Sequence, residues 1–145
     1  MERNAFQLEV VSPERPLFSG RATALTAEAH DGEMGILPGH AATLALLGTG
    51  VLVVRLVAEG GRETTERFAV RGGFLQVSGS KVTLLVTDAV RDREVDAPKV
   101  EAELATAKER LRQPPTDAAF AALLDERRWA ESRLRIGRGG APSGH

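Results

Sequence analysis

Two histidines and two acidic residues of the stretch 30–40 carry side-chain atoms that could ligate a metal ion. They are His30, Asp31, Glu33 and His40. The histidines stand ten positions apart across several glycines, without the i,i+4 spacing that places two ligands on one helix face. The chain has no cysteine, which excludes a thiolate site. We therefore expect no metal site.

Three carboxylates, at Asp92, Glu94 and Asp96, stand at the entry of a predicted helix. Acidic side chains are common there because they interact favourably with the helix dipole, so the cluster needs no catalytic role. A Gly-x-Ser-x-Gly elbow and a paired-carboxylate cleft are not apparent in the sequence. We therefore expect that the chain is not an enzyme.

Arginines are concentrated near the end of the chain. Between Glu126 and Arg138 the sequence has five arginines against two glutamates. Two interpretations remain open from the residues alone: a solvated helix face with a favourable dipole contact, or a contact for an acidic partner. The arginines are Arg127, Arg128, Arg133, Arg135 and Arg138.

The segment Gly32–His40, with the sequence GEMGILPGH, combines apolar residues with three glycines and a proline. Helices and strands seldom contain so many glycines and prolines in a short segment, and loops seldom contain so many large apolar residues. The segment therefore predicts a shaped loop with a small apolar tip and one histidine. Ile36 and Leu37 either form this tip or fold back into the body of the protein.

The secondary-structure elements that must position these residues fall into two halves of the chain. In the first half, residues 1–88, apolar and polar residues alternate as they do in β-strands. Apolar and polar residues alternate in 6–10, as in a strand with one buried face. Segments 51–57 and 66–70 flank a glycine-containing turn. Segments 75–77 and 82–86 flank another, so each pair predicts a hairpin. This pattern favours an antiparallel sandwich or barrel.

The second half, residues 89–136, has a helical period. One apolar stripe predicts a helix that Asp96 caps, and the prolines at 114–115 end it. Thr116 and Asp117 cap a second helix, which Gly137 ends. The first stripe is Val100, Leu104, Ala107 and Leu111, and the second is Phe120, Leu123, Ala130 and Leu134. Residues 137–145 have nothing to bury, and we expect a disordered tail.

The second helix has a further apolar face, because Trp129 and Ile136 point almost opposite to its stripe. Two interpretations stay open. In the first, the helix packs on the β-domain with one face and on the other helix with the opposite face. In the second, the hairpin can open, and one of these faces then binds a different protein.

Composition narrows the classes of function. The formal net charge of −1 gives no support to nucleic-acid binding, which requires a basic face. No window approaches the roughly 20 apolar residues that span a bilayer, and the start lacks the features of a signal or transit peptide. We expect a soluble protein that reaches a membrane only through a partner.

Three motifs at matching spacing carry a resemblance to a known family. They are Phe18–Gly20 (FSG), Gly35–His40 (GILPGH) and Gly72–Val77 (GGFLQV), and two helices follow them. With its flanking residues, the chain from Phe6 to Ile136 resembles the epsilon subunit of bacterial and plastid F-type ATP synthases. The resemblance implies an N-terminal β-sandwich of about ten strands and a C-terminal helical hairpin.

The resemblance also implies partners and roles. In this family the sandwich lies between the gamma subunit and the ring of c subunits, and catalysis belongs to the beta subunits. Glu33, Ile36 and His40 correspond to contacts with the c ring. The helices inhibit ATP hydrolysis at the beta and alpha subunits, with Arg127, Arg128 and Arg133 as contacts to beta. The resemblance places the chain on the cytoplasmic face of the bacterial cell membrane, in a proton-translocating complex.

Some family members bind regulatory ATP at the hairpin, through a motif of which this chain keeps only part. Asp96 and Arg133 match it, whereas Lys99 replaces an arginine and Trp129 replaces another. Lysine does not reproduce a bidentate guanidinium contact. We therefore expect weak ATP binding or none, and no other cofactor.

Two other classes of function fit the sequence less well than this family does. A non-catalytic β-sandwich that binds a ligand such as a carbohydrate would display planar aromatic side chains, yet the chain has one tryptophan and no tyrosine. A hydrolytic enzyme would need the catalytic groups that the sequence lacks.

Overall fold

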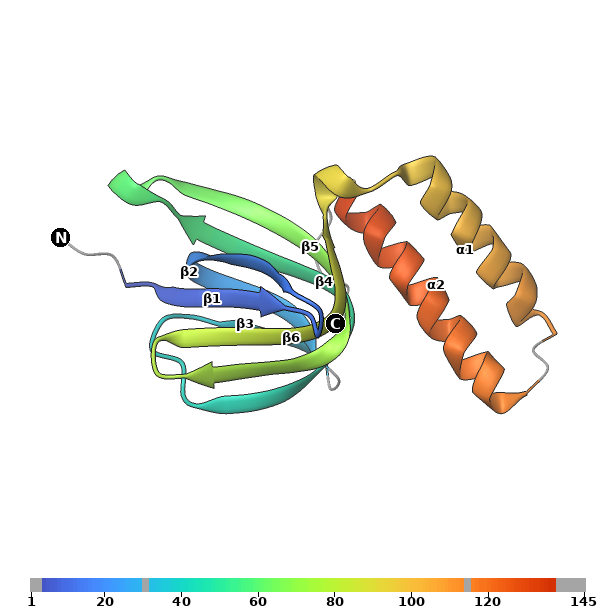
Figure 1. Cartoon of the computed structure of the whole chain (residues 1–145), viewed down its shortest axis with the longest axis horizontal. Coiled ribbons are helices and arrows are strands. Elements are labelled where there is room, and N and C mark those ends of the chain that lie inside the picture. Colours follow the sequence, from blue (N-terminus) through green and yellow to red (C-terminus); the bar gives the residue numbers. More distant parts are fainter. Residues whose placement is uncertain (1–3, 30–31, 114–115, 138–145) are drawn as a thin grey trace.

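The chain folds into a β-sheet body followed by two antiparallel helices (Figure 1), which confirms the expected fold class. The computed structural model describes residues 4–29, 32–113 and 116–137. The elements in these ranges are β1 (Phe6–Val11), β2 (Pro16–Ala29), β3 (Gly32–Ile36), β4 (Thr43–Val57), the 3₁₀ turn η1 (Glu59–Gly61), β5 (Glu63–Ser78), β6 (Lys81–Arg91), the 3₁₀ turn η2 (Asp92–Glu94), α1 (Ala97–Leu111) and α2 (Asp117–Gly137).

The strands of the described residues form one sheet in the order β1-β6-β5-β4-β2-β3. The sheet closes on itself because β1 pairs with β2 as well as with β6. The β1–β6 pair is parallel, and the other neighbouring pairs are antiparallel. Closure pairs the other strands on both sides and gives the body a fixed shape, whereas β3 remains an edge strand with β2 as its partner.

The strand count is lower than expected: the described residues contain six strands rather than about ten. The reason is that β2, β4 and β5 are 14, 15 and 16 residues long and bend, so each contributes to both layers of the sandwich. The β4–β5 pairing is interrupted between Leu47↔Gly73 and Gly50↔Val70. Both predicted hairpins are present, as β4–β5 and β5–β6.

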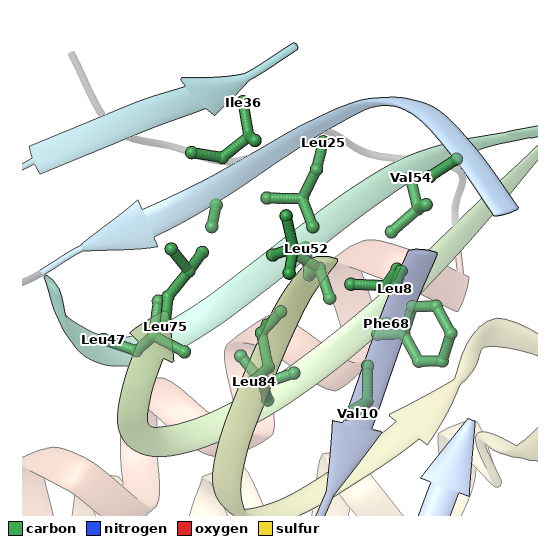
Figure 2. Packing of buried hydrophobic residues seen from close by; sticks show 14 of the residues in the cluster. Leu8, Val10, Leu25, Ile36, Leu47, Leu52, Val54, Phe68, Leu75 and Leu84 are labelled. Carbon is green, nitrogen blue, oxygen red and sulfur yellow. The ribbon is translucent and has the colours of Figure 1, made fainter. Parts of the chain in front are cut away.

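One apolar core fills the space between the layers (Figure 2). The alternation read in 6–10 is confirmed, since Phe6, Leu8 and Val10 are buried in this core. The last strand continues to Arg91, three residues past the expected end of the β-domain at residue 88, and α1 begins at Ala97. The labelled core residues of Figure 2 are Leu8, Val10, Leu25, Ile36, Leu47, Leu52, Val54, Phe68, Leu75 and Leu84.

The bend of β5 depends on Gly73, which has a φ of +147°. A Cβ atom at this position would overlap the main-chain carbonyl of Leu85 on β6. We predict that Gly73→Ala lowers the free energy of unfolding by about 1–3 kcal/mol, because both the backbone angle and the strand spacing become strained. Chemical denaturation measures this loss. Gly35→Ala is the control, since its Cβ would meet nothing closer than 3.9 Å. Equal loss in both variants would contradict the prediction.

Both helices begin at the predicted caps. The Asp96 carboxylate accepts a hydrogen bond from the Lys99 amide at 3.4 Å, and the Thr116 hydroxyl accepts one from the Ala119 amide at 3.0 Å. These bonds satisfy amide groups that lack a partner in a helix's first turn. The first helix ends at Leu111, whereas the prolines at 114–115 lie outside the described residues.

The second helix uses two apolar faces at once. Ala130 and Leu134 pack with Val100 of α1, while Trp129 and Ile136 pack on the sandwich. This confirms the interpretation in which α2 contacts both its sister helix and the β-domain, and the hairpin is compact (Figure 1). One predicted member of the stripe is wrong: Phe120, in the first turn of α2, is 43% exposed, because the apolar contact between α1 and α2 is formed by residues nearer the other end of α2. Of the predicted tail at 137–145, Gly137 is instead the last residue of α2, and residues 138–145 lie outside the described residues.

Candidate functional site

The segment Gly32–His40 is an edge strand followed by a tight turn, not a loop throughout. Residues Gly32–Ile36 pair with β2, and the His40 amide donates to the Leu37 carbonyl at 3.1 Å to close the turn. Gly39 takes a φ of +85°, which favours glycine at this corner. The turn lies at the end of the sandwich away from the helices (Figure 1).

The structure separates the residues that were predicted to contact the c ring. Glu33 is exposed and His40 is half-buried, with His40 Nδ1 2.8 Å from the Ala41 carbonyl oxygen. Ile36 is 1% exposed and belongs to the core, so its side chain is not available at this surface. Leu37, which is 63% exposed, is the apolar side chain of the turn. The sequence left this choice open because both residues are apolar neighbours.

An apolar patch covers the outer face of three neighbouring strands beside this turn. In the register, Leu46 of β4 lies opposite Phe74 of β5, which lies opposite Leu85 of β6. Side chains on one face of a strand recur every second residue, which adds Leu44 to the same face. The four residues of this apolar patch are Leu44 (71% exposed), Leu46 (46%), Phe74 (48%) and Leu85 (49%).

The apolar patch was not predicted from the sequence. Residues 44–47 are apolar on both faces, so alternation did not separate the buried Leu47 from the exposed leucines. Large exposed apolar side chains that adjoin on a rigid sheet mark a surface for protein contact.

A second group of residues joins α2 to the sandwich. Asp125 of α2 accepts hydrogen bonds from the Thr49 hydroxyl at 2.6 Å and from Arg71 Nη2 at 2.7 Å. Arg135 lies 3.5 Å from Glu28 of β2, and Trp129 and Ile136 fill the space between these polar contacts. Thr49, Arg71 and Asp125 were not singled out in the sequence, since partners so far apart along the chain leave no local signal.

The pKa of Asp125 is lower than its ordinary value. Partial burial alone would raise the pKa of this carboxyl, but the hydrogen bonds from Thr49 and Arg71 and the charges of Arg71 and Arg128 outweigh that effect. The carboxylate is therefore stabilised in the docked hairpin.

Acid should weaken the docking of α2. Because the pKa of Asp125 is depressed in the folded state, its contribution is present above the ordinary value of 3.8 and is lost as the pH falls through the folded value. We predict faster hydrogen exchange in α2 below about pH 4, after correction for the intrinsic exchange rate. Asp125→Asn should flatten this dependence. A profile that is equally steep in the variant would contradict the assignment to Asp125.

The arginines predicted to contact the beta subunit have different environments. Arg127 lies 3.8 Å from Glu131, and Arg128 is exposed. Both line a groove of about 530 Å³ between α2 and the sandwich. Arg133 is engaged, since its guanidinium lies 2.7 Å from Glu103 of α1 and its side chain is only 13% exposed.

Of the three residues that match or replace the ATP motif, two make contacts within the hairpin and the third is exposed. Asp96 caps α1, Lys99 is exposed, and Arg133 pairs with Glu103. The guanidinium of Arg133 also lies 4.8 Å from the centre of the Trp129 ring. A nucleotide phosphate would have to displace Glu103 to reach Arg133.

The described residues show neither a metal site nor a membrane-spanning helix. No cluster of three or more His, Asp or Glu side chains there is arranged to hold a metal ion, and His30 and Asp31 lie outside the described residues. No helix in the described ranges is both long and apolar enough to cross a membrane.

Comparison with known proteins identifies the family. The sequence model of the family "ATP synthase, Delta/Epsilon chain, beta-sandwich domain" matches residues 5–92. The ATP synthase epsilon chain of Corynebacterium urealyticum is 40% identical over 128 residues, which cover 88% of this chain and 89% of that one. The chain belongs to the family of ATP synthase epsilon chains. Epsilon chains are non-catalytic stalk subunits, which agrees with the expectation that this chain is not an enzyme.

Two further relatives support the assignment to the epsilon chains. The ATP synthase epsilon chain 2 of Photobacterium profundum is 36% identical over 119 residues, which cover 82% of this chain and 79% of that one. A chain in the cryo-EM structure of the Euglena gracilis mitochondrial ATP synthase, which contains OSCP, F1 and the c-ring, superposes with a TM-score of 0.76 at 26% identity. The superposition covers 94% of this chain and 82% of that one. The chain is therefore assigned to the epsilon family and not to the alternative class, a β-sandwich module that binds a ligand.

Proposed function

We propose that this chain joins the gamma subunit to the c ring in the central stalk of an ATP synthase, and that its helical hairpin inhibits ATP hydrolysis. The observation that carries the proposal is an exposed apolar patch on a closed, rigid sheet in a chain of the epsilon family. The superposition on a chain of an assembly that holds F1 and the c-ring supports the location in the stalk.

The apolar patch is the surface that we assign to the gamma subunit. Leu46, Phe74 and Leu85 lie in one row across three hydrogen-bonded strands, so they form a preorganised surface that needs little ordering on binding. A standard interface buries about 1,600 Å² in total, of which such a cluster forms the apolar centre and polar side chains form the rim.

The turn between β3 and β4 is the surface that we assign to the c ring. His40 supplies a polar contact, and Leu37 replaces Ile36 as the apolar contact because Ile36 is buried. Glu33 lies outside the turn, on β3 opposite Glu28. The turn directly precedes β4, so its position is fixed by the same sheet that carries the apolar patch. Rotation of gamma would thus be transmitted to the ring through one rigid body.

The hairpin is the part that we assign to inhibition. Arg127 and Arg128 are accessible for an acidic surface of the beta or alpha subunits, whereas Arg133 is released only when α1 and α2 separate. Exposed ion pairs contribute about 0.2–1 kcal/mol each, so several together can shift an equilibrium between two hairpin positions. We expect no role for ATP binding, and we place the assembled subunit on the cytoplasmic face of a bacterial membrane.

Reconstitution tests this function directly. ATP synthase depleted of its epsilon chain should recover ATP-driven proton pumping when this chain is added, and its ATP hydrolysis should fall. The double variant Leu46→Asp/Phe74→Asp serves as the control that cannot attach. If the wild-type chain restores neither coupling nor inhibition, the proposed function is wrong.

A further inference from the structure

The docked face of α2 is built around a single tryptophan. Trp129 is 6% exposed and packs with Val51, Ala69 and Ile136 in a cluster separate from the main core of the sandwich. Two of these partners, Val51 and Ala69, lie opposite each other on β4 and β5. The hairpin therefore rests on a small apolar seat at one end of the sheet.

Asp125, one turn before Trp129, makes the strongest polar contact with this seat. One carboxylate oxygen accepts from Arg71 Nη2 at 2.7 Å and from Arg71 Nε at 3.2 Å. The other oxygen accepts from the Thr49 hydroxyl at 2.6 Å. Charge-assisted hydrogen bonds of this kind are stronger than neutral ones and fix the direction of approach.

Two guanidinium groups flank Trp129. Arg71 of β5 lies 5.5 Å from the ring centre, and Arg133 of α2 lies 4.8 Å from it, both within cation–π range. Arg133 in turn pairs with Glu103 of α1 at 2.7 Å. A continuous series of contacts thus joins the sandwich, α2 and α1: Thr49, Asp125, Arg71, Trp129, Arg133 and Glu103.

A second contact secures the far end of α2. The Glu28 carboxylate accepts a hydrogen bond from the Val51 amide at 2.7 Å and lies 3.5 Å from Arg135 Nη1. A Cβ atom on Gly50 would overlap this carboxylate. Glycine at position 50 therefore leaves the space in which Glu28 connects β4 to α2.

We propose that these residues form a built-in latch that holds the hairpin on the sandwich without any bound ligand. Trp129 fills the space between Arg71 and Arg133, and Asp125 is bound from two strands, so every principal contact comes from the chain itself. The closed latch also withdraws Arg133 from any other protein. The latch is a property of the isolated chain, and only its consequence for inhibition rests on the proposed function.

The fluorescence of the chain reports the state of the latch, because Trp129 is its one tryptophan and there is no tyrosine. We predict that the nucleotide-free wild-type chain protects Trp129 from acrylamide quenching and that added ATP changes nothing. In Asp125→Asn the quenching constant should rise severalfold, and hydrogen exchange in α2 should accelerate roughly tenfold, as expected when a charge-assisted contact is lost. Arg71→Gln should act in the same direction.

Glu126→Gln is the matched control, because it removes one negative charge from the next position of α2 on an exposed side chain. It should behave like the wild type. Exchange in β1 and β6 separates release of the hairpin from unfolding, since the core of the sandwich should stay protected in all variants.

Three results would overturn the latch. The first is that Trp129 of the wild-type chain is protected from quenching only after ATP is added. The second is that Asp125→Asn shows the same quenching and α2 exchange as Glu126→Gln. The third is that the effects of Arg71→Gln and Asp125→Asn on these quantities add in the double variant, as they do for residues that do not interact. If the latch opens as predicted in the isolated chain but Asp125→Asn does not strengthen inhibition in the reconstituted enzyme, the latch stands and the inhibitory role of the hairpin fails.

Discussion

Deletion of residues 96–145 should raise the ATP hydrolysis rate of the reconstituted synthase roughly fivefold or more, while attachment to the stalk remains. The physical reason is that the hairpin and the body have separate cores. The main core consists of sandwich residues alone, and α2 touches the sheet through a separate small cluster around Trp129 and through the polar contacts of Asp125 and Arg135. The apolar patch lies on another part of β4–β6 and is unchanged by the deletion.

The steady-state hydrolysis rate with saturating amounts of each form measures this effect. The full-length double variant Arg127→Glu/Arg128→Glu is the informative comparison, because it keeps the hairpin but reverses the charge of the two most exposed arginines of α2. It should also release inhibition, to a smaller extent. If hydrolysis by the truncated enzyme equals that of the full-length form, the hairpin has no inhibitory role in this protein.

Substitution of Phe74 by Glu should weaken binding to the gamma subunit more than about a hundredfold, which corresponds to nearly 3 kcal/mol. Phe74 is the centre of the row that it forms with Leu46 and Leu85. A carboxylate at the centre of an apolar interface would be desolvated without a partner. Because the side chain is 48% exposed in the free chain, the fold should survive the change.

Calorimetric titration of purified gamma with each variant measures this loss. Thr64→Glu is the control, since Thr64 is exposed on the same strand but near the opposite end of β5. It should bind gamma as the wild type does. Equal affinities of Phe74→Glu and Thr64→Glu would move the gamma contact away from the apolar patch.

Local signals predicted most of the fold. The alternation around Leu8, the glycine turns between strands and the caps at Asp96 and Thr116 each act over a few residues, so they are legible in one sequence. The strand count was wrong because Gly48, Gly50 and Gly73 bend long strands instead of ending them. A glycine within a strand has the same appearance in a sequence whether the chain turns or bends there.

The sites were harder to predict because their residues meet through tertiary packing. Arg71 and Asp125 are 54 positions apart, and the apolar patch draws on three strands whose register sets which leucines face outward. Trp129 is the exception. Its position opposite to the apolar stripe of α2 predicted a second packing face, and Trp129 does pack on the sandwich. At Ile36 and Leu37 the resemblance pointed to Ile36, whereas Leu37 is the exposed side chain of the pair, since burial of a strand end depends on its partner strand.

The most direct test of the central claim is hydrogen exchange of the full chain with and without the gamma subunit. If the sandwich attaches to the stalk through its apolar patch, gamma should slow exchange in segments 43–47, 73–76 and 84–86, beyond the protection that the strand pairing already gives. Exchange in α1 should stay as it is in the free chain. Protection confined to the helices, or no protection at all at saturating gamma, would contradict the account.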